Sequence, residues 1–433
     1  MTSIELNKYS DQITRLEKAN RATEAQSAKL SPHHPHAHPV HVMYGGAHLF
    51  SENTFSKICQ MAQDAMKFAA TDGKSLRALV GADWTDDFAG NLYTRVTKKL
   101  ADEALEDYRI DFEDGYGVRP DEEEDAHAKS TAATLVTLAR GLKTPRHVGF
   151  RIKPLSIVAM RRSLRTLAIF IKELAAVGVK DSGLKHLVVT LPKVTNAEQV
   201  ATLVDILEGY EDEHRLGPGF FGVELLVESP EAFLSIDGTL PLPGFIAAAR
   251  GRCKSLHFGI YDFTSSLGIG SAGQAIDHLA CDFARMWMQV AAGLAPGLGI
   301  SDGIINRLPL VPKEHSKSAI AAFQDTWRYN YTQMTRSLTL GYYQGWDLHP
   351  SQLPVRHVAN HVFVLRELDQ AVSRLKMFTD KASKASHVGG VFDDRASVLG
   401  LINFFERAVS SGVLTASEVT NLGVDLDAVR RTI

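Results

Sequence analysis

The sequence predicts an α/β fold, a closed (β/α)8 TIM barrel with a C-terminal helical extension. Three observations support this prediction. Short apolar or β-branched runs alternate with longer segments of 3.6-residue apolar spacing, eight such runs occur, and polar residues follow nearly every run. This alternation is typical of parallel strands covered by helices. A doubly wound open sheet is the alternative, but it needs fewer repeats and gathers its functional groups at one crevice.

The predicted elements follow one another in a regular order. Strands are expected at residues 41–46, 108–114, 147–153, 186–193, 222–228, 255–262, 298–304 and 341–350. Helices are expected between them at residues 53–70, 91–106, 121–140, 158–177, 196–209, 230–249, 273–293 and 314–338. The gap between the first two strands is long enough for two helices.

Three regions follow from this order. Residues 1–39 form a polar N-terminal segment that ends in a His/Pro-rich loop, residues 40–378 form the barrel, and residues 379–433 form a C-terminal helical lid. Five histidines within residues 31–41 leave two interpretations open, a metal site or a surface loop, and the prolines favour the loop. The Lys/Ser/Gly composition of residues 381–390 predicts a mobile connection to the lid.

Composition excludes several classes of protein. Of the 433 residues, 45% are apolar and 22% are charged, as in ordinary globular proteins, and the net charge of −3 gives no reason to expect a nucleic acid or membrane partner. No run of 18 apolar residues occurs, and the N-terminus lacks the apolar core of a signal peptide. Cys59, Cys253 and Cys281 form no CxxC pair, which argues against disulfides and a zinc site. A cytoplasmic location is expected.

Charged and polar residues follow seven consecutive predicted strands. In chain order they are Glu113, Asp114, Arg151, Lys153, Lys193, Glu228, Asp262, Asp302, Asp347 and His349. In a barrel all of these strand ends meet at one mouth, where barrel enzymes keep their active sites. The pattern therefore predicts a functional site at that mouth.

The densest acidic stretch is YRIDFEDGYG at residues 108–117. On the two-residue period of a strand, Asp111 should face the same way as Glu113 and opposite to Asp114. At most part of this cluster can then face the cavity. We therefore interpret Glu113 and Asp114 as supporting residues at the rim of the site.

Glu228 and Asp262 are the predicted metal ligands. Each closes an apolar strand, and the two strands are consecutive. Two such carboxylates suit Mg²⁺, which takes one or two carboxylates and fills its shell with water and substrate oxygens. The alternative is that both acids cap the helices that follow, since ESPEAF resembles a helix start.

Arg151 and Lys193 are the candidate cations. Arg151 has apolar neighbours and needs an anionic partner, either a substrate carboxylate, as in a 2-oxo acid, or the acids of the second strand. Lys193 could form a Schiff base in a metal-independent aldolase, but two metal-type carboxylates favour a supporting charge.

The segment GIGSAG at 268–273 matches GxGxxG, but it is separated from its strand and lacks the later acid-ended strand of a dinucleotide site.

Seven fragments in order resemble the citrate lyase β-subunit and HpcH/HpaI aldolase superfamily, which includes malyl-CoA lyases. They are IDFEDGYG, EEEDAHAKS, FRIKP, VVTLPKV, VELLVESPEAF, LHFGIYDFTSSLG and WDLHPSQL, spread over residues 110–353. The resemblance extends over about residues 40–400. It implies a divergent member that uses Mg²⁺ or Mn²⁺ to make or break a carbon–carbon bond through an enolate.

The resemblance also implies roles for single residues. Glu228 and Asp262 would bind the metal, Arg151 would stabilise the oxyanion, and Glu113 and Asp114 would order the metal's waters. The substrate-binding set would comprise Arg151, Lys193, Gly259, Tyr261 and His349. The segment GGVFDDRA resembles a family motif that closes over a neighbouring subunit's site, so Asp393, with Asp394 as its ambiguous neighbour, would be the acid or base. Such a lid implies a homo-oligomer, a trimer or hexamer.

The chain departs from the family at two places. YGGAHLF stands where coenzyme A-binding members have V-P-G, followed by about forty extra residues, and Arg151-Ile152-Lys153 stands for R-V-N. We therefore expect a carbon–carbon lyase acting on a small hydroxy or oxo acid or on its CoA thioester, with proton transfer by Asp393 or a water on the metal. The alternatives are a condensing acyltransferase, a thioester hydrolase, or a non-catalytic barrel that binds a small acid.

Overall fold

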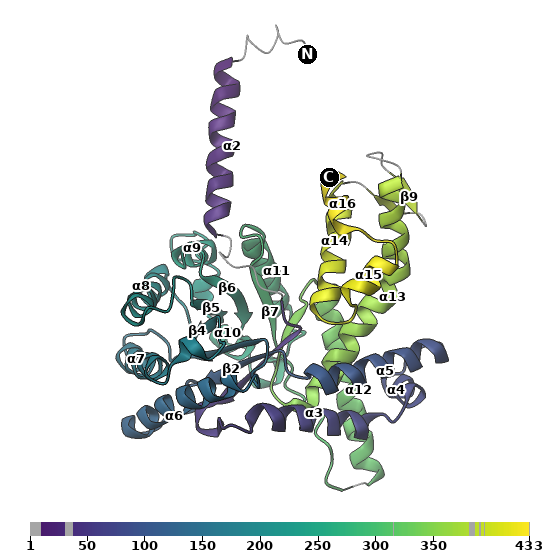
Figure 1. Cartoon of the computed structure of the whole chain (residues 1–433), viewed down its shortest axis with the longest axis horizontal. Coiled ribbons are helices and arrows are strands. Elements are labelled where there is room, and N and C mark those ends of the chain that lie inside the picture. The colour runs from purple at the N-terminus through teal and green to yellow at the C-terminus, as the bar shows by residue number, and fades with distance from the viewer. Residues whose placement is uncertain are drawn as a thin grey trace. The chain divides into compact units, whose positions relative to one another are not determined.

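Eight parallel strands close into a barrel in chain order in this computed structural model, which confirms the predicted fold class (Figure 1). The structure describes residues 10–30, 38–314, 316–380, 386–388, 391–393 and 395–432. The barrel strands are β1 (His41–Gly46), β2 (Asp107–Asp111), β3 (His147–Arg151), β4 (Leu187–Leu191), β5 (Phe221–Val227), β6 (Cys253–Phe258), β7 (Gly299–Ile304) and β8 (Gln344–Asp347).

The burial of strands β4 to β6 explains why their sequences are largely continuous apolar runs. Every residue of these three strands is buried, because side chains on one face fill the barrel and those on the other pack under helices. In the register, Thr190 of β4 lies opposite Glu224 of β5, and Glu224 lies opposite Ser255 of β6. The strand ends that follow therefore lie at one level and can share a site.

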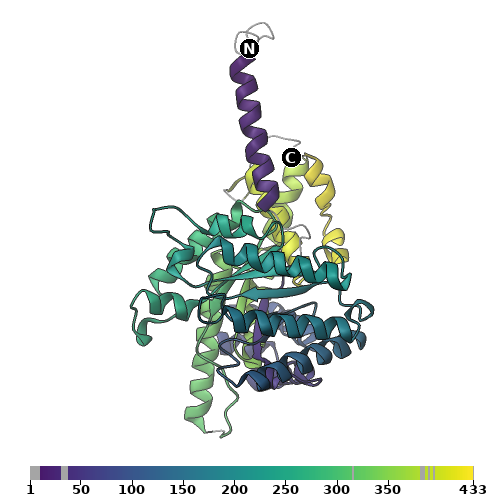
Figure 2. The same ribbon diagram turned by 90° about the vertical axis from the view of Figure 1, so that its left-hand side faces the viewer.

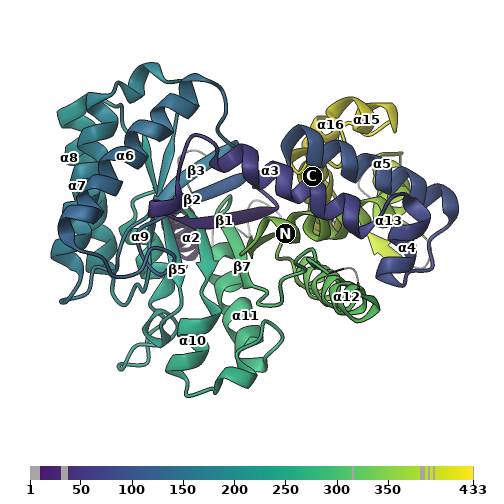
Figure 3. The ribbon, with the colours of Figure 1, turned by 90° about the horizontal axis from the view of Figure 1, so that it is seen from below.

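The chain divides into two compact units, which we describe separately. The first comprises the described parts of residues 1–36, 112–136 and 149–300. Its helices are α2 (Ser10–Leu30), most of α6 (Asp121–Arg140), α7 (Met160–Ala176), α8 (Ala197–His214), α9 (Leu242–Ala248), α10 (Ile260–Ser266) and α11 (Leu279–Gly293). Helices α6, α7 and α8 lie side by side on its outer surface (Figure 3). Helix α2 extends away from the rest of this unit (Figures 1 and 2).

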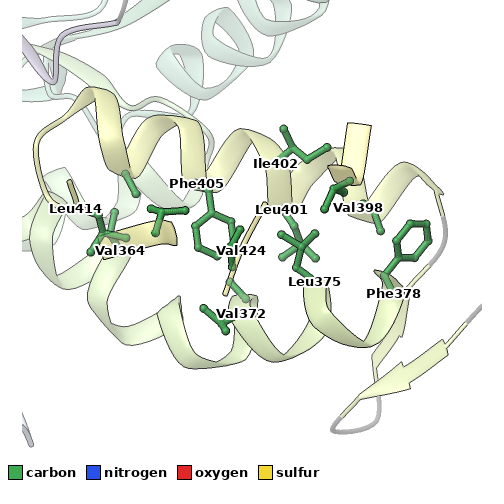
Figure 4. Packing of buried hydrophobic residues seen from close by; sticks show 14 of the residues in the cluster. Val364, Val372, Leu375, Phe378, Val398, Leu401, Ile402, Phe405, Leu414 and Val424 are labelled. Atoms are coloured by element: carbon green, nitrogen blue, oxygen red, sulfur yellow. The ribbon is translucent and has the colours of Figure 1, made fainter. Parts of the chain in front are cut away.

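The second unit comprises the described parts of residues 37–111, 137–148 and 301–433. Its helices are α3 (Thr54–Ala69), α4 (Gly73–Val80), α5 (Asp86–Glu103), α12 (Lys317–Thr339), α13 (Leu353–Asp380), α14 (Arg395–Ser410), α15 (Ala416–Asn421) and α16 (Leu426–Thr432). Helices α13 and α14 enclose a separate apolar core around Leu375, Leu401 and Phe405 (Figure 4). Short strands β9 (Ser386–Val388) and β10 (Val391–Asp393) pair antiparallel.

Two predicted helical regions differ from the structure. Residues 230–249 form only a 3-10 turn, Pro230–Ala232, and the short helix α9, because Gly238 has a positive φ of 80° and prolines follow it. The gap between β1 and β2 holds three helices, α3 to α5, instead of two. In both regions turn and capping residues outweighed apolar spacing.

Several sequence-based expectations remain predictions. Most of the His/Pro-rich loop, residues 31–37, and residues 381–385 and 389–390 of the predicted connection lie outside the described residues. The region boundaries at residues 39 and 378 are not tested, although α13 continues to Asp380. No helix among those the structure describes combines the length and apolar character needed to cross a bilayer.

Candidate functional site

The ends of β4, β5 and β6 supply three of the charged side chains of one cavity. Lys193, Glu228 and Asp262 line this cavity, which has a volume of about 1030 Å³ and lies wholly within the first unit. The three residues follow their strands by one to four positions, at the carboxyl ends where barrel enzymes carry out chemistry. The cavity is therefore the candidate active site.

Lys193 lies at the centre of a carboxylate cluster. We define the carboxylate cluster as Glu113, Asp114, Glu228 and Asp262. The Lys193 ammonium lies 2.5 Å from Glu113 Oε1, 3.3 Å from Asp114 Oδ2 and 3.5 Å from Asp262 Oδ2. Its backbone N–H donates a hydrogen bond of 2.8 Å to Glu228 Oε1. One residue thus contacts all four carboxylates.

The backbone of Lys193 is strained. Its φ is 52°, in the left-handed region that side chains with a Cβ rarely adopt. Such strain persists only where the surrounding contacts overdetermine it, and it concentrates at functional sites. In this left-handed conformation the Lys193 N–H donates its hydrogen bond to Glu228, so the strained backbone is part of the candidate site.

The pKa of Lys193 bears on the Schiff-base interpretation. Partial burial lowers the pKa of the ammonium, but the Glu113 carboxylate and its neighbours outweigh burial and raise the pKa above its usual value. A Schiff-base lysine must be neutral to attack a carbonyl, which requires a lowered pKa. The geometry therefore favours a permanent positive charge at this position.

Glu228 is the buried member of the carboxylate cluster. It is 3% exposed, and burial together with the nearby Asp262 carboxylate raises its pKa to about 8. Gly259 makes room for it, since a Cβ on Gly259 would lie 2.1 Å from Glu228 Oε2 and 2.6 Å from its Cβ. The site is thus shaped around a carboxyl group that, without a cation beside it, is costly to ionise.

Arg151 lies behind the cavity wall. It is 2% exposed and is not among the residues that line the cavity. Its Nη1 lies 3.0 Å from Glu113 Oε2 and 3.8 Å from Asp114 Oδ2, so the ion pair with the acids after β2 forms.

Lys153, the other cation after β3, contacts the Phe112 carbonyl oxygen at 2.6 Å and Glu124 at 2.7 Å. It therefore holds neighbouring elements together.

Glu113 and Asp114 both point toward Lys193, contrary to the strand alternation predicted for them. The reason is that β2 ends at Asp111, so residues 112–114 do not follow a two-residue period. Burial raises the pKa of Glu113. Partial burial also acts to raise the pKa of Asp114, but its hydrogen bond with Glu113 and the two nearby cations lower that pKa below its usual value.

A buried polar layer lies within the barrel strands that carry the site. Glu224 is fully buried; its Oε1 accepts a hydrogen bond of 2.6 Å from Thr190, and its Oε2 accepts one of 2.8 Å from Ser255. Nε2 of His257 lies 2.9 Å from Glu224 Oε2. These contacts tie β4, β5 and β6 together, so they fix the relative positions of the strand ends that hold the site.

The residues present fit a hard divalent cation in chemistry and charge. The carboxylate cluster carries four negative charges when ionised, and Arg151 and Lys193 carry two positive charges, so two negative charges remain for one divalent ion. Carboxylate oxygens are the ligands that Mg²⁺ takes. Among the described residues, no group of three or more His, Cys, Asp or Glu side chains is arranged to hold a metal. The protein would therefore supply one or two carboxylates.

The remaining predicted site residues are distributed as follows. Gly259 underlies Glu228, and Tyr261 lies on α10 with 42% of its surface exposed. His349 belongs to the second unit, where its Nδ1 accepts a hydrogen bond of 3.1 Å from the Ser351 N–H and caps a 3-10 turn, Pro350–Gln352. Asp393 ends β10, and its side chain, like all of Asp394, lies outside what the structure describes. Its role stays a prediction.

Sequence reasoning missed a group of apolar side chains that lines the cavity. Leu155, Ile157 and Val158, from the segment between β3 and α7, line the cavity together with Met160, the first residue of α7. Ile157 and Val158 are 92% and 95% exposed. The signal was present, because PLSIVAM at 154–160 is an apolar run in a loop directly after a strand. Loops in this position are usually polar, so an apolar run there indicates a surface that contacts something other than water.

The fold and site together define a (β/α)8 barrel with a candidate active site at the carboxyl ends of its strands. The chain belongs to the family described as "Domain of unknown function (DUF6986)", which matches residues 20–432. A citrate lyase structure from Burkholderia xenovorans is similar, with a TM-score of 0.56 and 17% identity, covering 90% of this chain and 98% of that one. The predicted superfamily resemblance is thus confirmed at the level of the fold.

Two further solved structures match with lower scores. A Haloferax volcanii malate synthase, in complex with magnesium and glyoxylate, has a TM-score of 0.48 and 15% identity, covering 92% of this chain and 99% of that one. CitE from Mycobacterium tuberculosis, in complex with magnesium, acetoacetate and coenzyme A, has a TM-score of 0.46 and 16% identity, covering 85% and 97%. Curated protein sequences give no significant match.

Proposed function

We propose that the protein is a divalent-metal-dependent carbon–carbon lyase of the aldolase type, acting on a small hydroxy or oxo acid. The observation that carries this proposal is the carboxylate cluster around Lys193, of which Glu228 and Asp262 line one cavity together with Lys193. Glu228 and Asp262 would hold Mg²⁺ or Mn²⁺. When bound, such an ion polarises a carbonyl and stabilises the negative charge of an enolate, which is worth several kcal/mol.

The chain's own residues bind and orient the substrate. Lys193 stays protonated, because its pKa is raised, and its ammonium attracts the substrate carboxylate into the cavity. Glu113 holds Lys193 through one oxygen and Arg151 through the other. Arg151 would add positive charge behind the developing oxyanion. This arrangement fixes the two cations relative to each other before substrate arrives, so little is lost to reorganisation during the reaction.

Bond cleavage requires a base and then an acid. The substrate hydroxyl loses its proton, the carbon–carbon bond breaks, its electron pair becomes the enolate, and a proton then returns to that carbon. Asp393 is the residue predicted to move this proton, from a lid over a neighbouring subunit in a homo-oligomer. The cytoplasmic location and the trimeric or hexameric assembly likewise stay predictions.

The test is cleavage of candidate substrates by metal-stripped and Mg²⁺- or Mn²⁺-loaded protein. The panel contains 4-hydroxy-2-oxo acids and malyl- and citramalyl-CoA, with release of pyruvate, glyoxylate or oxaloacetate as the readout. We expect metal-dependent release that Glu228→Gln lowers by about 100-fold. The matched control is Glu213→Ala, an exposed acid in the same unit that is not among the residues lining the cavity.

Two results would contradict this proposal. Metal-independent cleavage that Lys193→Ala abolishes would identify a Schiff-base aldolase instead. Tight binding of an acid without release of any product would identify a non-catalytic small-acid-binding barrel. A condensing transferase would show itself by bond formation from a thioester and an oxo acid in the same mixture.

A further inference from the structure

The side chains that line the candidate active-site cavity include two chemically different groups, which we call its charged wall and its apolar wall. Lys193, Glu228 and Asp262 form a charged wall at the strand ends. The apolar wall consists of Leu155, Ile157 and Val158 from the segment between β3 and α7 and of Met160, the first residue of α7. A three- or four-carbon acid would need only the charged wall. The apolar wall therefore requires its own explanation.

The size of the cavity points in the same direction. Its volume of about 1030 Å³ is at the upper end of the about 300–1,000 Å³ typical of pockets that enclose a drug-sized ligand. Such a volume exceeds what a carboxylate, a keto group and two or three further carbons fill. A substrate that occupied both walls would carry an acid group at one end and a bulky apolar group at the other.

The exposure of the apolar wall supports an occupant. Ile157 and Val158 are 92% and 95% exposed, and Met160 is 38% exposed, so this surface contacts water in the described structure. Contiguous exposed apolar side chains usually mark a binding surface. Because these side chains share a cavity with the charged wall, a molecule bound there would contact both.

The charges of the cavity argue against a coenzyme A thioester. Among the described residues that line it, Lys193 is the positively charged one, whereas Glu198, Glu231, Glu228 and Asp262 are acidic. Phosphate groups are recognised by arginine and lysine side chains and by helix N-termini. A ligand with several phosphates would meet an excess of negative charge here, and a free acid carries only one carboxylate.

We propose that the substrate is a free 4-hydroxy-2-oxo acid whose hydroxyl-bearing carbon carries a large apolar group, and that this group packs on Leu155, Ile157, Val158 and Met160. This inference rests on the proposed lyase function. The reaction converts R–CH(OH)–CH₂–CO–COO⁻ into the aldehyde R–CHO and pyruvate. The hydroxyl proton leaves, the bond between the third and fourth carbons breaks, and its electron pair accepts a proton on the pyruvate methyl carbon, so the atoms balance.

The first test compares chain lengths. The Mg²⁺-loaded protein is given 4-hydroxy-2-oxopentanoate, in which R is methyl, 4-hydroxy-2-oxodecanoate, in which R is hexyl, and malyl-CoA. Burial of one methylene is worth about fourfold. We therefore expect kcat/KM to be at least about tenfold higher for the hexyl than for the methyl substrate. Equal values for the two acids, or faster cleavage of the thioester, would overturn the inference while leaving the lyase function intact.

The second test uses matched variants. Ile157→Asp and Val158→Asp should each lower kcat/KM for the hexyl substrate more than for the methyl substrate, and so remove most of the preference for the longer acid. Val118→Asp is the control, because Val118 is 96% exposed in the same unit but is not among the residues that line the cavity. If Ile157→Asp changes the sedimentation of the protein but not its preference for the hexyl substrate, the apolar wall is a subunit contact and the inference is overturned.

Binding separates this inference from the lyase proposal. Calorimetry with 2-oxobutanoate and 2-oxodecanoate, which cannot be cleaved, should show at least about tenfold tighter binding of the longer acid. If no substrate is cleaved but this difference appears and Ile157→Asp removes it, the lyase function fails and the apolar subsite stands. If 2-oxodecanoate binds no tighter than 2-oxobutanoate, the subsite is refuted whatever the activity.

Discussion

At the scale of single residues, Gly259 decides where the Glu228 carboxylate can lie. An added Cβ would meet Glu228 Oε2 at 2.1 Å, a distance that real contacts do not reach, so the carboxylate must move. We expect Gly259→Ala to weaken Mn²⁺ binding and to slow cleavage by about tenfold to 100-fold, because it shifts a proposed ligand without removing it. Calorimetry with Mn²⁺ and steady-state kinetics measure both effects.

The control for this substitution is Gly270→Ala. Gly270 has an ordinary φ of −66°, and no atom lies within 4 Å of the position its Cβ would take. Alanine there should change neither Mn²⁺ binding nor activity. If Gly259→Ala behaves like Gly270→Ala, the Glu228 carboxylate is not held where the described geometry has it.

The strain at Lys193 can be separated from its charge. Lys193→Ala removes the ammonium but keeps a Cβ at a φ of 52°, whereas Lys193→Gly removes both. A left-handed backbone costs a residue with a Cβ about 1 kcal/mol, so the glycine variant should be more stable than the alanine variant by that amount. Urea unfolding measures the difference, and both variants should lose activity equally.

If Lys193→Ala and Lys193→Gly unfold at the same urea concentration, the backbone at this position is not strained. If the glycine variant keeps activity that the alanine variant lacks, the backbone conformation, and not the ammonium, is what the site needs. Either result would change the role assigned to this residue.

At the scale of elements, the polar layer inside β4, β5 and β6 supports the site from below. Glu224→Ala would leave Thr190, Ser255 and His257 without their shared buried partner. Removing the shared partner of a buried polar network of this kind typically costs about 3–5 kcal/mol. We expect a loss of this size in chemical unfolding, together with weaker activity, because the strand ends lose their fixed spacing.

Glu224→Gln is the matched variant for this prediction. Its amide keeps one oxygen acceptor and nearly the same volume, so it should cost clearly less than Glu224→Ala. Equal and small losses for both variants would show that the three strands are held by backbone pairing and apolar packing alone.

The elements also show what the sequence could and could not predict. The strand at residues 41–46 and the helix at residues 121–140 were predicted at their observed bounds, because apolar periodicity dominates there. The helix expected at 230–249 failed at Gly238 and the following prolines, where turn geometry outweighs periodicity. The left-handed backbone conformation of Lys193 could not be predicted from the sequence. It depends on contacts with residues distant in the chain, namely the acid after β5 and the acids after β2.

At the scale of the whole molecule, buried histidines should make the second unit sensitive to acid. The second unit buries three histidines, His41, His357 and His361, each almost fully. Burial lowers the pKa of His357 and of His361 to about 3, and it lowers the pKa of His41 well below its usual value. The hydrogen bonds agree with a neutral His41, since its Nε2 accepts the Glu106 N–H at 3.0 Å and so cannot carry a proton.

These shifts fix the direction of the pH dependence. Below a pH of about 6.5 the histidines of the unfolded chain take up protons that the folded unit does not bind, so unfolding is favoured as the pH falls toward about 3. Each such histidine contributes a slope of about 1.4 kcal/mol per pH unit. Three of the four tryptophans, Trp84, Trp327 and Trp346, lie in the second unit, so tryptophan fluorescence mainly reports its unfolding.

We therefore expect the free energy of unfolding, followed by tryptophan fluorescence in urea, to fall steeply between pH 6 and pH 4. His361→Leu should reduce that slope by about 1.4 kcal/mol per pH unit, because one proton fewer is taken up on unfolding. His278→Leu is the comparison, because His278 lies in the first unit, and this substitution should leave the slope unchanged. A slope that His361→Leu leaves unchanged would mean that this histidine is already protonated in the folded unit, and that other buried groups set its acid sensitivity.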